Sequence, residues 1–217
     1  MGQIQYTDND RFEGEWDSGY RHGMGLHYYA NGDCYDGEWA KDLPSGTGTY
    51  TTTTGFIYIG NWFQGKMHGA GTLKSPNGRC YQGEFKNGLK CGEGRMDFAN
   101  GDFYMGQWLH DKPHGYGIYH SAVEGIYEGQ FAIGLREGQG KFIYRTGEVY
   151  EGGWKKNLFH DKGVYTSPNG AIEKYDGLWE FGKLSGKGTL HYRYGKLDGN
   201  FKEDKVCSFF FFLDFKK

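Results

Sequence analysis

The segment YDGEW at residues 35–39 decides the fold, because close variants of it recur throughout the chain. The tyrosine that opens it returns every 23 residues, and FEGEW at residues 12–16 begins the series on the same spacing. Two later copies open at Tyr175 and Leu197, after steps of 25 and 22 residues. A fixed period of this length predicts an array of repeats. The tyrosines on the 23-residue spacing are Tyr35, Tyr58, Tyr81, Tyr104, Tyr127 and Tyr150.

Each copy of the segment alternates between two kinds of side chain. Its first, third and fifth residues share one side of a strand, whereas the polar residues between them, often acidic, face the other side. The central glycine leaves a slot in which an aromatic ring can lie against the backbone. We therefore expect a structural ladder of buried aromatic residues. Its members are Trp16, Tyr35, Trp39, Tyr58, Trp62, Tyr81, Phe85, Tyr104, Trp108, Tyr127, Phe131, Tyr150, Trp154, Tyr175 and Trp179.

The rest of each repeat predicts a second strand. A polar stretch of about six residues suggests a hairpin loop, and a Gly-x-Gly pair such as Gly46 and Gly48 follows it. Two positions later comes a large residue that is apolar in every repeat except the first, where it is His27. Asn-Gly, as at Asn31, then predicts a tight turn into the next repeat, because both residues tolerate positive φ. No stretch has a 3.6-residue apolar period, so we expect almost no helix.

Irregularities in the spacing test this interpretation. The insertion at residues 171–174 adds two residues, and an even insertion keeps every later side chain on its face. Asp161 replaces the first glycine of its Gly-x-Gly pair, and the step from Gly195 to Leu197 is one residue short. We expect distorted geometry at those two places. On the polar face, substitutions such as Glu84→Ala should change stability by less than about 0.5 kcal/mol.

The combination of Tyr-x-Gly-x-Trp, a polar loop, His-Gly-x-Gly and Asn-Gly resembles the MORN repeat (membrane occupation and recognition nexus). The resemblance covers residues 12–201 as eight full repeats and a partial ninth, between an N-terminal segment, 1–11, and an aromatic tail, 202–217. It implies an all-β fold class: an elongated, single-layer, twisted antiparallel sheet of tandem β-hairpins, with seventeen strands. In such an array, stability sums over neighbouring repeats.

Composition and charge exclude several classes of partner. The chain has 39 glycines but only 4 prolines, and its 34 tyrosines and phenylalanines (18 and 16) favour packing over disorder. Its 27 acidic and 25 basic residues leave a net charge of −2, which provides no drive toward nucleic acid. Residues 1–10 are too polar for a signal peptide, and no apolar run is long enough to span a bilayer.

The four cysteines indicate a reducing, cytoplasmic location. None forms a C-x-x-C pair, and Cys34 and Cys80 occupy the same position two repeats apart. Four strand spacings would separate them by about 19 Å. A disulfide needs Cα atoms within about 7 Å. We expect free thiols, as in reducing compartments.

No residue pattern favours an enzyme, a metal site or a cofactor. Four histidines at one repeat position suggest either a metal ladder or rings that support the loops by hydrogen bonds: His22, His68, His114 and His160. A separation of about 19 Å favours the second, because ligands lie about 2 Å from a shared zinc. The glycine pairs open no helix, so they do not match a phosphate-binding loop. Acidic pairs such as Asp36 and Glu38 recur too often to mark a catalytic site.

Two surface features bear on partners. Basic residues in the loops suggest an edge that binds lipid phosphate weakly, although the net charge favours ordinary solubility: Lys66, Lys90, Lys112, Lys183 and Arg136. The tail either caps the final hairpin or inserts into a partner, since an open strand edge needs cover and an exposed apolar patch usually marks an interface. The tail residues proposed for partner binding are Phe209, Phe210, Phe211, Phe212, Leu213 and Phe215.

The leading functional prediction is a non-catalytic scaffold for protein–protein interaction. An aromatic-lined sheet offers a groove for a helix or an extended peptide. The resemblance implies a structural subunit of a cytoskeletal assembly, such as the radial spokes of a ciliary axoneme, in the cytoplasm. The alternative is a peripheral membrane adaptor that binds anionic phospholipid headgroups.

Overall fold

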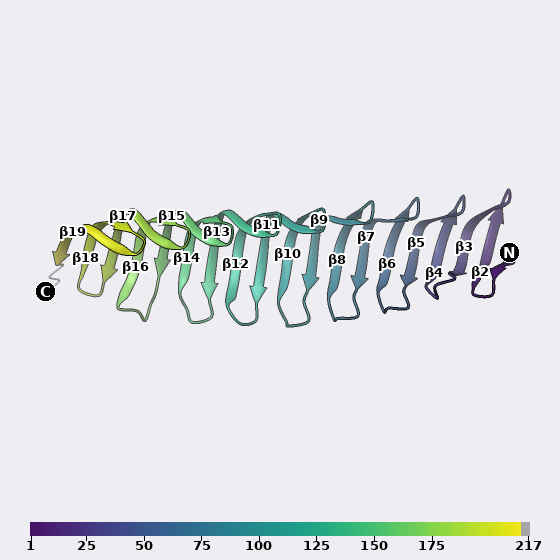
Figure 1. The fold of residues 1–217 in the computed structure, drawn as a ribbon, viewed down its shortest axis with the longest axis horizontal. Coiled ribbons are helices and arrows are strands. Elements are labelled where there is room, and N and C mark those ends of the chain that lie inside the picture. Colours follow the sequence, from purple (N-terminus) through teal and green to yellow (C-terminus); the bar gives the residue numbers. More distant parts are fainter. Residues whose placement is uncertain (214–217) are drawn as a thin grey trace. The chain divides into compact units, whose positions relative to one another are not determined.

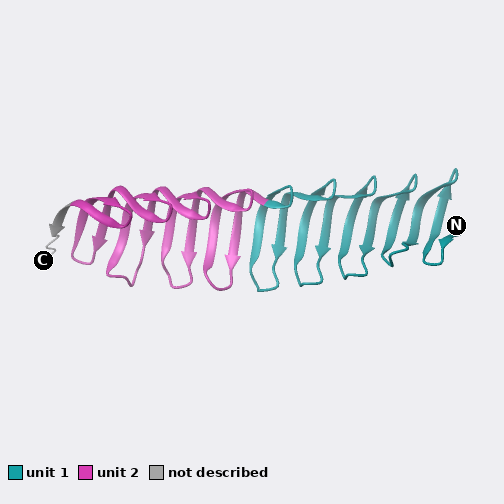
Figure 2. Cartoon of the chain, viewed as in Figure 1, with its two compact units in different colours: residues 1–112 teal, residues 113–217 magenta. Residues whose placement is uncertain are grey.

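Antiparallel β-strands make up the regular structure of the chain, seen in the computed structural model of Figure 1, which describes residues 1–213. These residues form nineteen strands, and no membrane-spanning helix occurs among them. The chain divides into two compact units, residues 1–112 and 113–217, and each is considered by itself (Figure 2). Within each unit every strand pairs with the strands before and after it in sequence.

Unit 1 contains five hairpin-sized pairs of strands. Its strands are β1 (Gly2–Thr7), β2 (Asp10–Asp17), β3 (Tyr20–Tyr28), β4 (Cys34–Ala40), β5 (Leu43–Thr51), β6 (Ile57–Phe63), β7 (Lys66–Lys74), β8 (Cys80–Lys86), β9 (Leu89–Asp97) and β10 (Phe103–Leu109).

Unit 2 repeats the same arrangement. Its strands are β11 (Lys112–Ser121), β12 (Gly125–Ala132), β13 (Leu135–Tyr144), β14 (Val149–Lys155), β15 (Leu158–Thr166), β16 (Ile172–Glu180), β17 (Lys183–Tyr192), β18 (Gly195–Lys202) and β19 (Lys205–Leu213). The predicted all-β fold of antiparallel hairpin repeats is therefore confirmed. The seventeen expected strands are too few, because both flanking segments also pair: β1 with β2 and β19 with β18.

The two faces of the sheet differ as the alternation predicts. In β4, Tyr35 and Trp39 are 0% and 3% exposed, whereas Asp36 between them is exposed. Gly37 lies opposite Gly48 of β5, and a Cβ on Gly48 would come within 2.3 Å of the Tyr35 hydroxyl oxygen. The tyrosine ring thus lies flat on bare backbone. Its hydroxyl donates a hydrogen bond to the Glu38 carbonyl at 3.0 Å.

Edge-to-face ring contacts link neighbouring repeats on this aromatic face. Tyr35 lies 5.1 Å from both Trp39 of its own repeat and Trp62 of the next, with ring planes near perpendicular. Such geometry suits the quadrupoles of the rings. Each tryptophan also reaches back one repeat, since the Trp39 indole N–H donates to the Gly25 carbonyl at 3.0 Å. Of the fifteen aromatic residues expected to form a ladder, Trp16 and Trp62 are half-buried and the others are buried.

The turns differ from the predicted ones. The six-residue polar stretch is no loop: strands run through it, and only two residues turn the chain. Between β2 and β3 these are Ser18 and Gly19, with φ of 51° and 83°. Two successive positive φ angles give a type I′ turn, whose twist matches that of paired strands. The polar residues after such turns therefore belong to strands and have a defined face.

The Asn-Gly segment, by contrast, is part of a longer loop. Between β3 and β4, the Tyr29 N–H donates to the Asp33 carbonyl at 2.9 Å. Gly32 has a φ of 84°, but Asn31 does not adopt positive φ. Instead, the Asn31 side chain accepts the Asp33 N–H at 3.0 Å. The tight turn predicted there is replaced by this longer loop, because the asparagine contributes an acceptor rather than a left-handed backbone.

Neither expected distortion is found. Asp161 keeps a φ of 56° and pairs with Trp179, just as Gly46, with a φ of 68°, pairs with Trp62. Aspartate adopts this conformation more readily than most residues, which explains the retained geometry. Between β17 and β18 a two-residue connection absorbs the missing residue without a shift of register. After the two-residue insertion, Tyr175 remains buried on the aromatic face.

Candidate functional site: the clefts of the aromatic face

An apolar cleft of about 370 Å³ opens on the aromatic face of unit 1. Trp62 of β6 and Met67 of β7 lie opposite each other in register, and Leu73 of β7 lies opposite Tyr58. Tyr50 of β5 and Phe56 complete the apolar lining. Burial raises the pKa of the Tyr58 phenol to about 12, so this wall stays uncharged at physiological pH. The cleft is thus a preformed apolar surface between repeats.

A neighbouring cleft of unit 1, about 480 Å³, is more polar. Arg21 lies over the Trp39 ring at 4.3 Å and forms an ion pair with Asp42 at 3.2 Å. The Arg21 guanidinium also donates to His27 Nδ1 at 2.9 Å, and His27 Nε2 lies 2.7 Å from Asp10 Oδ1. Because arginine only donates, Nδ1 accepts and Nε2 carries the hydrogen bound by Asp10. The charge of Arg21 is therefore neutralised within the unit.

The sequence singled out His27 as the polar exception but did not reveal this network. Asp10 lies 17 residues before His27, and Asp42 lies 21 residues after Arg21, so only strand pairing brings the four groups together. The available signal was an aspartate at a turn 21 residues after a basic residue near the start of the second strand. Lys90 and Asp111 repeat that arrangement, with Nζ and Oδ1 3.4 Å apart.

Unit 2 has a cleft of about 470 Å³ at the equivalent position. Arg136 lies over the Trp154 ring at 4.6 Å and the Phe142 ring at 5.2 Å. The residue 21 positions later is Asn157, whose side-chain oxygen accepts the Arg136 backbone N–H at 2.8 Å. No ion pair of Arg136 is present in the described part of the chain. Burial lowers the pKa of its guanidinium, but arginine remains protonated.

Within each unit, the basic residues expected to line an edge fall on different kinds of position: Lys66, Lys90 and Lys112 in unit 1, and Arg136 and Lys183 in unit 2. Lys90 and Arg136 lie over aromatic rings on the aromatic face. The other three are exposed beside turns. Sequence alone placed all five in loops, because the strands were expected to begin later.

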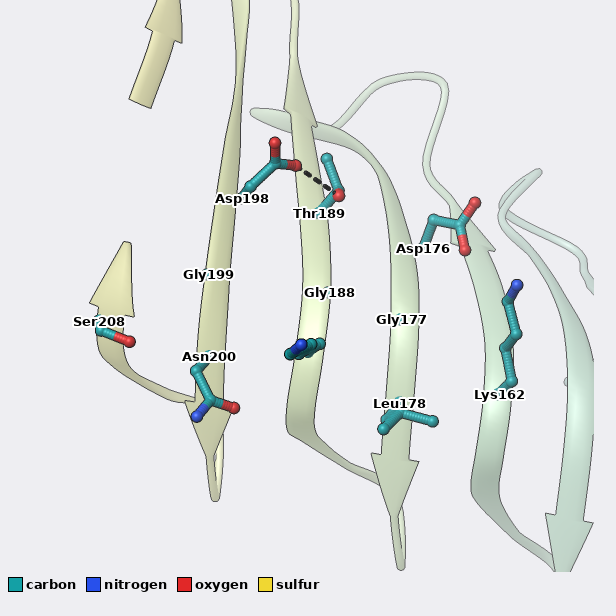
Figure 3. A pocket seen from close by; sticks show the side chains of 11 residues that line it. Lys162, Asp176, Gly177, Leu178, Gly188, Thr189, Asp198, Gly199, Asn200 and Ser208 are labelled. Carbon is teal, nitrogen blue, oxygen red and sulfur yellow. Dashed lines mark hydrogen bonds between the residues drawn. The ribbon is translucent and has the colours of Figure 1, made fainter. Parts of the chain in front are cut away.

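The opposite face has a shallow pocket of about 560 Å³ in unit 2 (Figure 3). Lys162 and Asp176 line it from neighbouring strands, and Thr189 donates to Asp198 at 2.6 Å. That hydrogen bond lowers the pKa of the Asp198 carboxyl. Its lysines and aspartates alternate, so the pocket has no strong preference for either sign of charge.

Acidic residues of this face have a structural role that the sequence did not show. Glu38 accepts both the Thr47 N–H and the Thr47 hydroxyl at 2.8 Å, where Gly46 adopts positive φ. These bonds lower the pKa of Glu38. Two repeats after Glu38, Glu84 accepts the Glu93 N–H at 3.2 Å. Glu84 remains exposed, so the small effect expected of Glu84→Ala stays a prediction, and both carboxylates accept hydrogen bonds beside a glycine of positive φ.

The histidines at the shared repeat position do not form a metal site. No group of three or more His, Cys, Asp or Glu side chains suited to a metal occurs within residues 1–213. The Phe181 N–H donates to His160 Nδ1 at 3.3 Å, which is the expected support of a turn. Nδ1 of His68 and Nδ1 of His114 have no hydrogen-bond partner among the described residues. All four cysteines are free thiols.

The proposed tail residues reach beyond what the structure describes. The backbone of β19 pairs with β18, with Phe209 opposite Gly199 and Phe211 opposite Leu197. The side chains of residues 209–213 and the whole of Phe215 lie outside the described residues. Capping of the array and insertion into a partner thus both stay predictions.

Comparisons with known proteins concern the repeats. The family model described as MORN repeat matches eight segments that together cover more than half of the chain: residues 12–34, 35–56, 58–78, 81–103, 104–123, 127–149, 150–172 and 175–196. No curated protein sequence matches the chain.

One similar solved structure is the SAS-4 (dCPAP) TCP domain of Drosophila melanogaster in complex with a proline-rich motif of Ana2 (dSTIL). The sequences are 14% identical, the match covers 79% of this chain and 90% of that chain, and the TM-score is 0.46. A similarity this low supports no inference about this chain.

Proposed function

Because the chain belongs to the MORN-repeat family, we propose that it is a non-catalytic scaffold whose aromatic face binds a helix or an extended peptide of a protein partner. Proteins of this family are generally not enzymes. The observation that carries the proposal is the apolar cleft between Trp62 and Leu73 in unit 1. Ligand sites are typically concave, apolar and preformed, with a few polar groups that set orientation.

The rigidity of the cleft walls supports this proposal. Tyr58 and Trp62 are held by hydrogen bonds to the Asn61 and Gly48 carbonyls, at 2.8 and 3.1 Å. A partner side chain that enters the cleft therefore does not have to immobilise them, and preorganised surfaces lose less entropy on binding. Burial of apolar surface contributes about 25 cal/mol per Å² in return. Apolar side chains from a helix or a strand of the partner fit such a wall.

The competing proposal is attachment to anionic phospholipid. It would use exposed lysines such as Lys66, Lys112 and Lys183, but these do not converge on one cleft. The chain as a whole has a net charge of −2, which provides no general attraction to an anionic membrane. We place the scaffold in a cytoskeletal assembly of the cytoplasm, with the ciliary axoneme as one such site. That placement rests on the resemblance to other proteins of short MORN arrays.

A pair of photo-crosslinking variants tests the site of binding. A benzoylphenylalanine replaces Leu73, which lines the cleft, or Thr72, the preceding residue of β7 on the opposite face. Both variants of the full chain are irradiated in a cytoskeletal extract of ciliated cells, and products are identified by mass spectrometry. We expect a defined partner at Leu73 that is absent at Thr72. Equal products at both positions would contradict docking on the aromatic face.

Vesicle binding separates the two proposals. Phosphatidylcholine vesicles with and without phosphatidylinositol bisphosphate are sedimented with the chain at low and high salt. Salt-sensitive binding that needs the phosphoinositide would favour the membrane adaptor, because such attraction is screened within a Debye length. Failure to sediment with either kind of vesicle at either salt concentration favours the protein scaffold.

A further inference from the structure

Arg136 differs from the other basic residues at its repeat position in having no acidic partner. Arg21 and Lys90 each pair with an aspartate 21 residues later, Asp42 and Asp111. At the same distance from Arg136 stands Asn157. The Arg136 Nη2 donates to the Asn157 carbonyl at 3.3 Å, and no carboxylate within the described residues pairs with the guanidinium. Most of its N–H groups are thus available to a ligand.

The walls around Arg136 are apolar. Trp154 is 4% exposed and forms one wall, and Phe142, Phe159 and Leu158 add further apolar surface. The Trp154 indole is held in place by its hydrogen bond to the Gly140 carbonyl at 3.0 Å. A guanidinium over an aromatic ring keeps its edge free for a planar acceptor, and a carboxylate matches that edge with two parallel hydrogen bonds. The cleft combines one fixed cation with an apolar surface.

One acidic residue also lines this cleft. Burial lowers the pKa of Arg136, and the charge of Glu124, which is exposed at the rim, offsets only part of that lowering without forming an ion pair. For a ligand with two negative charges, the attraction to Arg136 and the repulsion from Glu124 both double, whereas the cost of taking its charge out of water grows as the square of the charge. The largely apolar cleft therefore favours a singly charged carboxylate over a doubly charged phosphate group.

We propose that the Arg136 cleft binds an aspartate or glutamate side chain of the protein partner, next to an apolar side chain that packs on Trp154 and Phe159. This inference rests on the proposed scaffold function and specifies the chemistry of the partner segment. It concerns an acidic anchor in unit 2, whereas the apolar cleft of unit 1 needs none.

The test uses 3-phenylpropionate as a probe, with its uncharged amide and phenyl phosphate as comparisons. Each is titrated into the full chain, and binding is followed by the NMR signal of the Trp154 indole N–H, assigned from Trp154→Phe. We expect 3-phenylpropionate to bind at least about tenfold more tightly than the amide, since a hydrogen bond to a charged group is among the stronger ones. Phenyl phosphate should bind more weakly than the carboxylate.

Three variants control for charge and folding. Asn157→Asp supplies the carboxylate that pairs with Arg21 and with Lys90 in unit 1, and should weaken binding of 3-phenylpropionate about as much as Arg136→Gln. Arg145→Gln makes the same change in net charge in unit 2 outside the cleft, and should bind like the wild type. Unshifted indole N–H signals of the tryptophans outside the cleft before titration show that a variant is folded.

Equal binding of acid and amide, or unchanged binding by a folded Asn157→Asp protein, would overturn the proposal. Tighter binding of phenyl phosphate would replace the acidic peptide with a phosphate ligand. Self-association of the chain that Arg136→Gln abolishes would make a second copy the occupant instead. Each result leaves the crosslink expected at Leu73 unaffected, so the acidic anchor and the scaffold function fail separately.

Discussion

The Arg21 neighbourhood of unit 1 and the Arg136 neighbourhood of unit 2 are built on the same repeat positions but differ in charge balance. Each guanidinium lies over a tryptophan, Trp39 at 4.3 Å and Trp154 at 4.6 Å. In unit 1 Asp42 pairs with the guanidinium, whereas in unit 2 Asn157 occupies that place. A single exchange of an oxygen for an amide nitrogen thus decides whether the charge is neutralised within the sheet.

The comparison teaches how a repeat array can diversify. The tyrosine, glycine and tryptophan positions maintain the backbone, so they are alike in both units. The turn residues Asp42 and Asn157 each accept the backbone N–H of the basic residue 21 positions earlier, at 2.9 and 2.8 Å. Because both Asp42 and Asn157 adopt positive φ, with values of 66° and 69°, either residue fits the same turn. Charge can therefore change at this place at little cost to the fold.

The largest expected effect comes from removing the ring beneath each arginine. Trp39→Ala and Trp154→Ala should each lower the free energy of unfolding by about 3–5 kcal/mol, because both side chains are buried. Urea denaturation of the full chain measures the loss. Trp154→Phe is the matched control, since Phe85 and Phe131 already occupy this repeat position, and it should cost only about 1 kcal/mol for the lost indole hydrogen bond. A loss below that control value in either alanine variant would show that the tryptophan does not stabilise both neighbourhoods in the same way.

A smaller effect is expected at the first position of the Gly-x-Gly pair, where the backbone adopts positive φ. Gly46→Ala should destabilise the chain by about 1–2 kcal/mol, because left-handed backbone is unfavourable for alanine and the new Cβ would lie 2.4 Å from the Glu38 carboxyl carbon. Asp161 holds the same position in unit 2, so Asp161→Gly should stabilise the chain by about 0.5 kcal/mol. Thermal melts of both variants check the signs. A destabilising Asp161→Gly would mean that the aspartate side chain contributes more than its backbone strain costs.

The third prediction separates the units by pH. Glu38 in unit 1 and Gln130 in unit 2 both accept the backbone N–H of the residue after a glycine of positive φ, at 2.8 and 2.7 Å. Hydrogen bonds from Thr47 lower the folded-state pKa of Glu38, so its stabilising contribution is complete above the unfolded pKa of about 4.3. It is lost as the pH falls through the lower, folded pKa. Gln130 does not titrate.

Stability curves from neutral to acidic pH test this difference. The advantage of the wild type over Glu38→Gln should shrink as the pH falls below about 4.3, because the variant keeps an acceptor but loses the titrating group. Amide exchange should show the change at Thr47 and leave Gln139 unaffected. An advantage that stays constant with pH would show that the carboxylate charge contributes nothing at this position.

The smallest effect is expected from exchanging the two partners of the arginines. Asp42→Asn should cost about 0.2–1 kcal/mol, because the Asp42 side chain is 44% exposed and such ion pairs are weak. Asn157→Asp should raise stability by a similar or smaller amount by pairing with Arg136. Denaturation midpoints of the two variants measure both changes. A loss on Asn157→Asp would indicate that Glu124 repels the new carboxylate more than Arg136 attracts it.

Much of the fold was predictable because a strand has a two-residue period. Alternation placed Tyr35 and Trp39 on one face and Asp36 on the other, and that assignment holds even after the insertion before Tyr175. The turns were predicted less well. A polar sequence indicates that a segment is exposed but not how long the loop is, so strand residues such as Lys90 and Arg136 were assigned to loops.

The candidate site was predicted only as a general aromatic groove. Its specific features depend on residues far apart in sequence, such as Trp154 with Gly140 and Arg136 with Asn157. A repeat pattern shows which positions are equivalent, but it does not show which equivalent side chains touch. The pairing of Glu38 with Thr47 was missed for the same reason.

The sequence by itself determined the repeat, the antiparallel hairpins and the aromatic face, because these follow from local periodicity and from the glycines on which the tyrosine rings lie. Only the tertiary structure decided where charge remains available. The pairing of strands brings residue 136 to residue 157 and residue 21 to residue 42, and hydrogen-bond geometry then determines which cation is neutralised. Such distances depend on the folded register of the strands, which no single repeat contains.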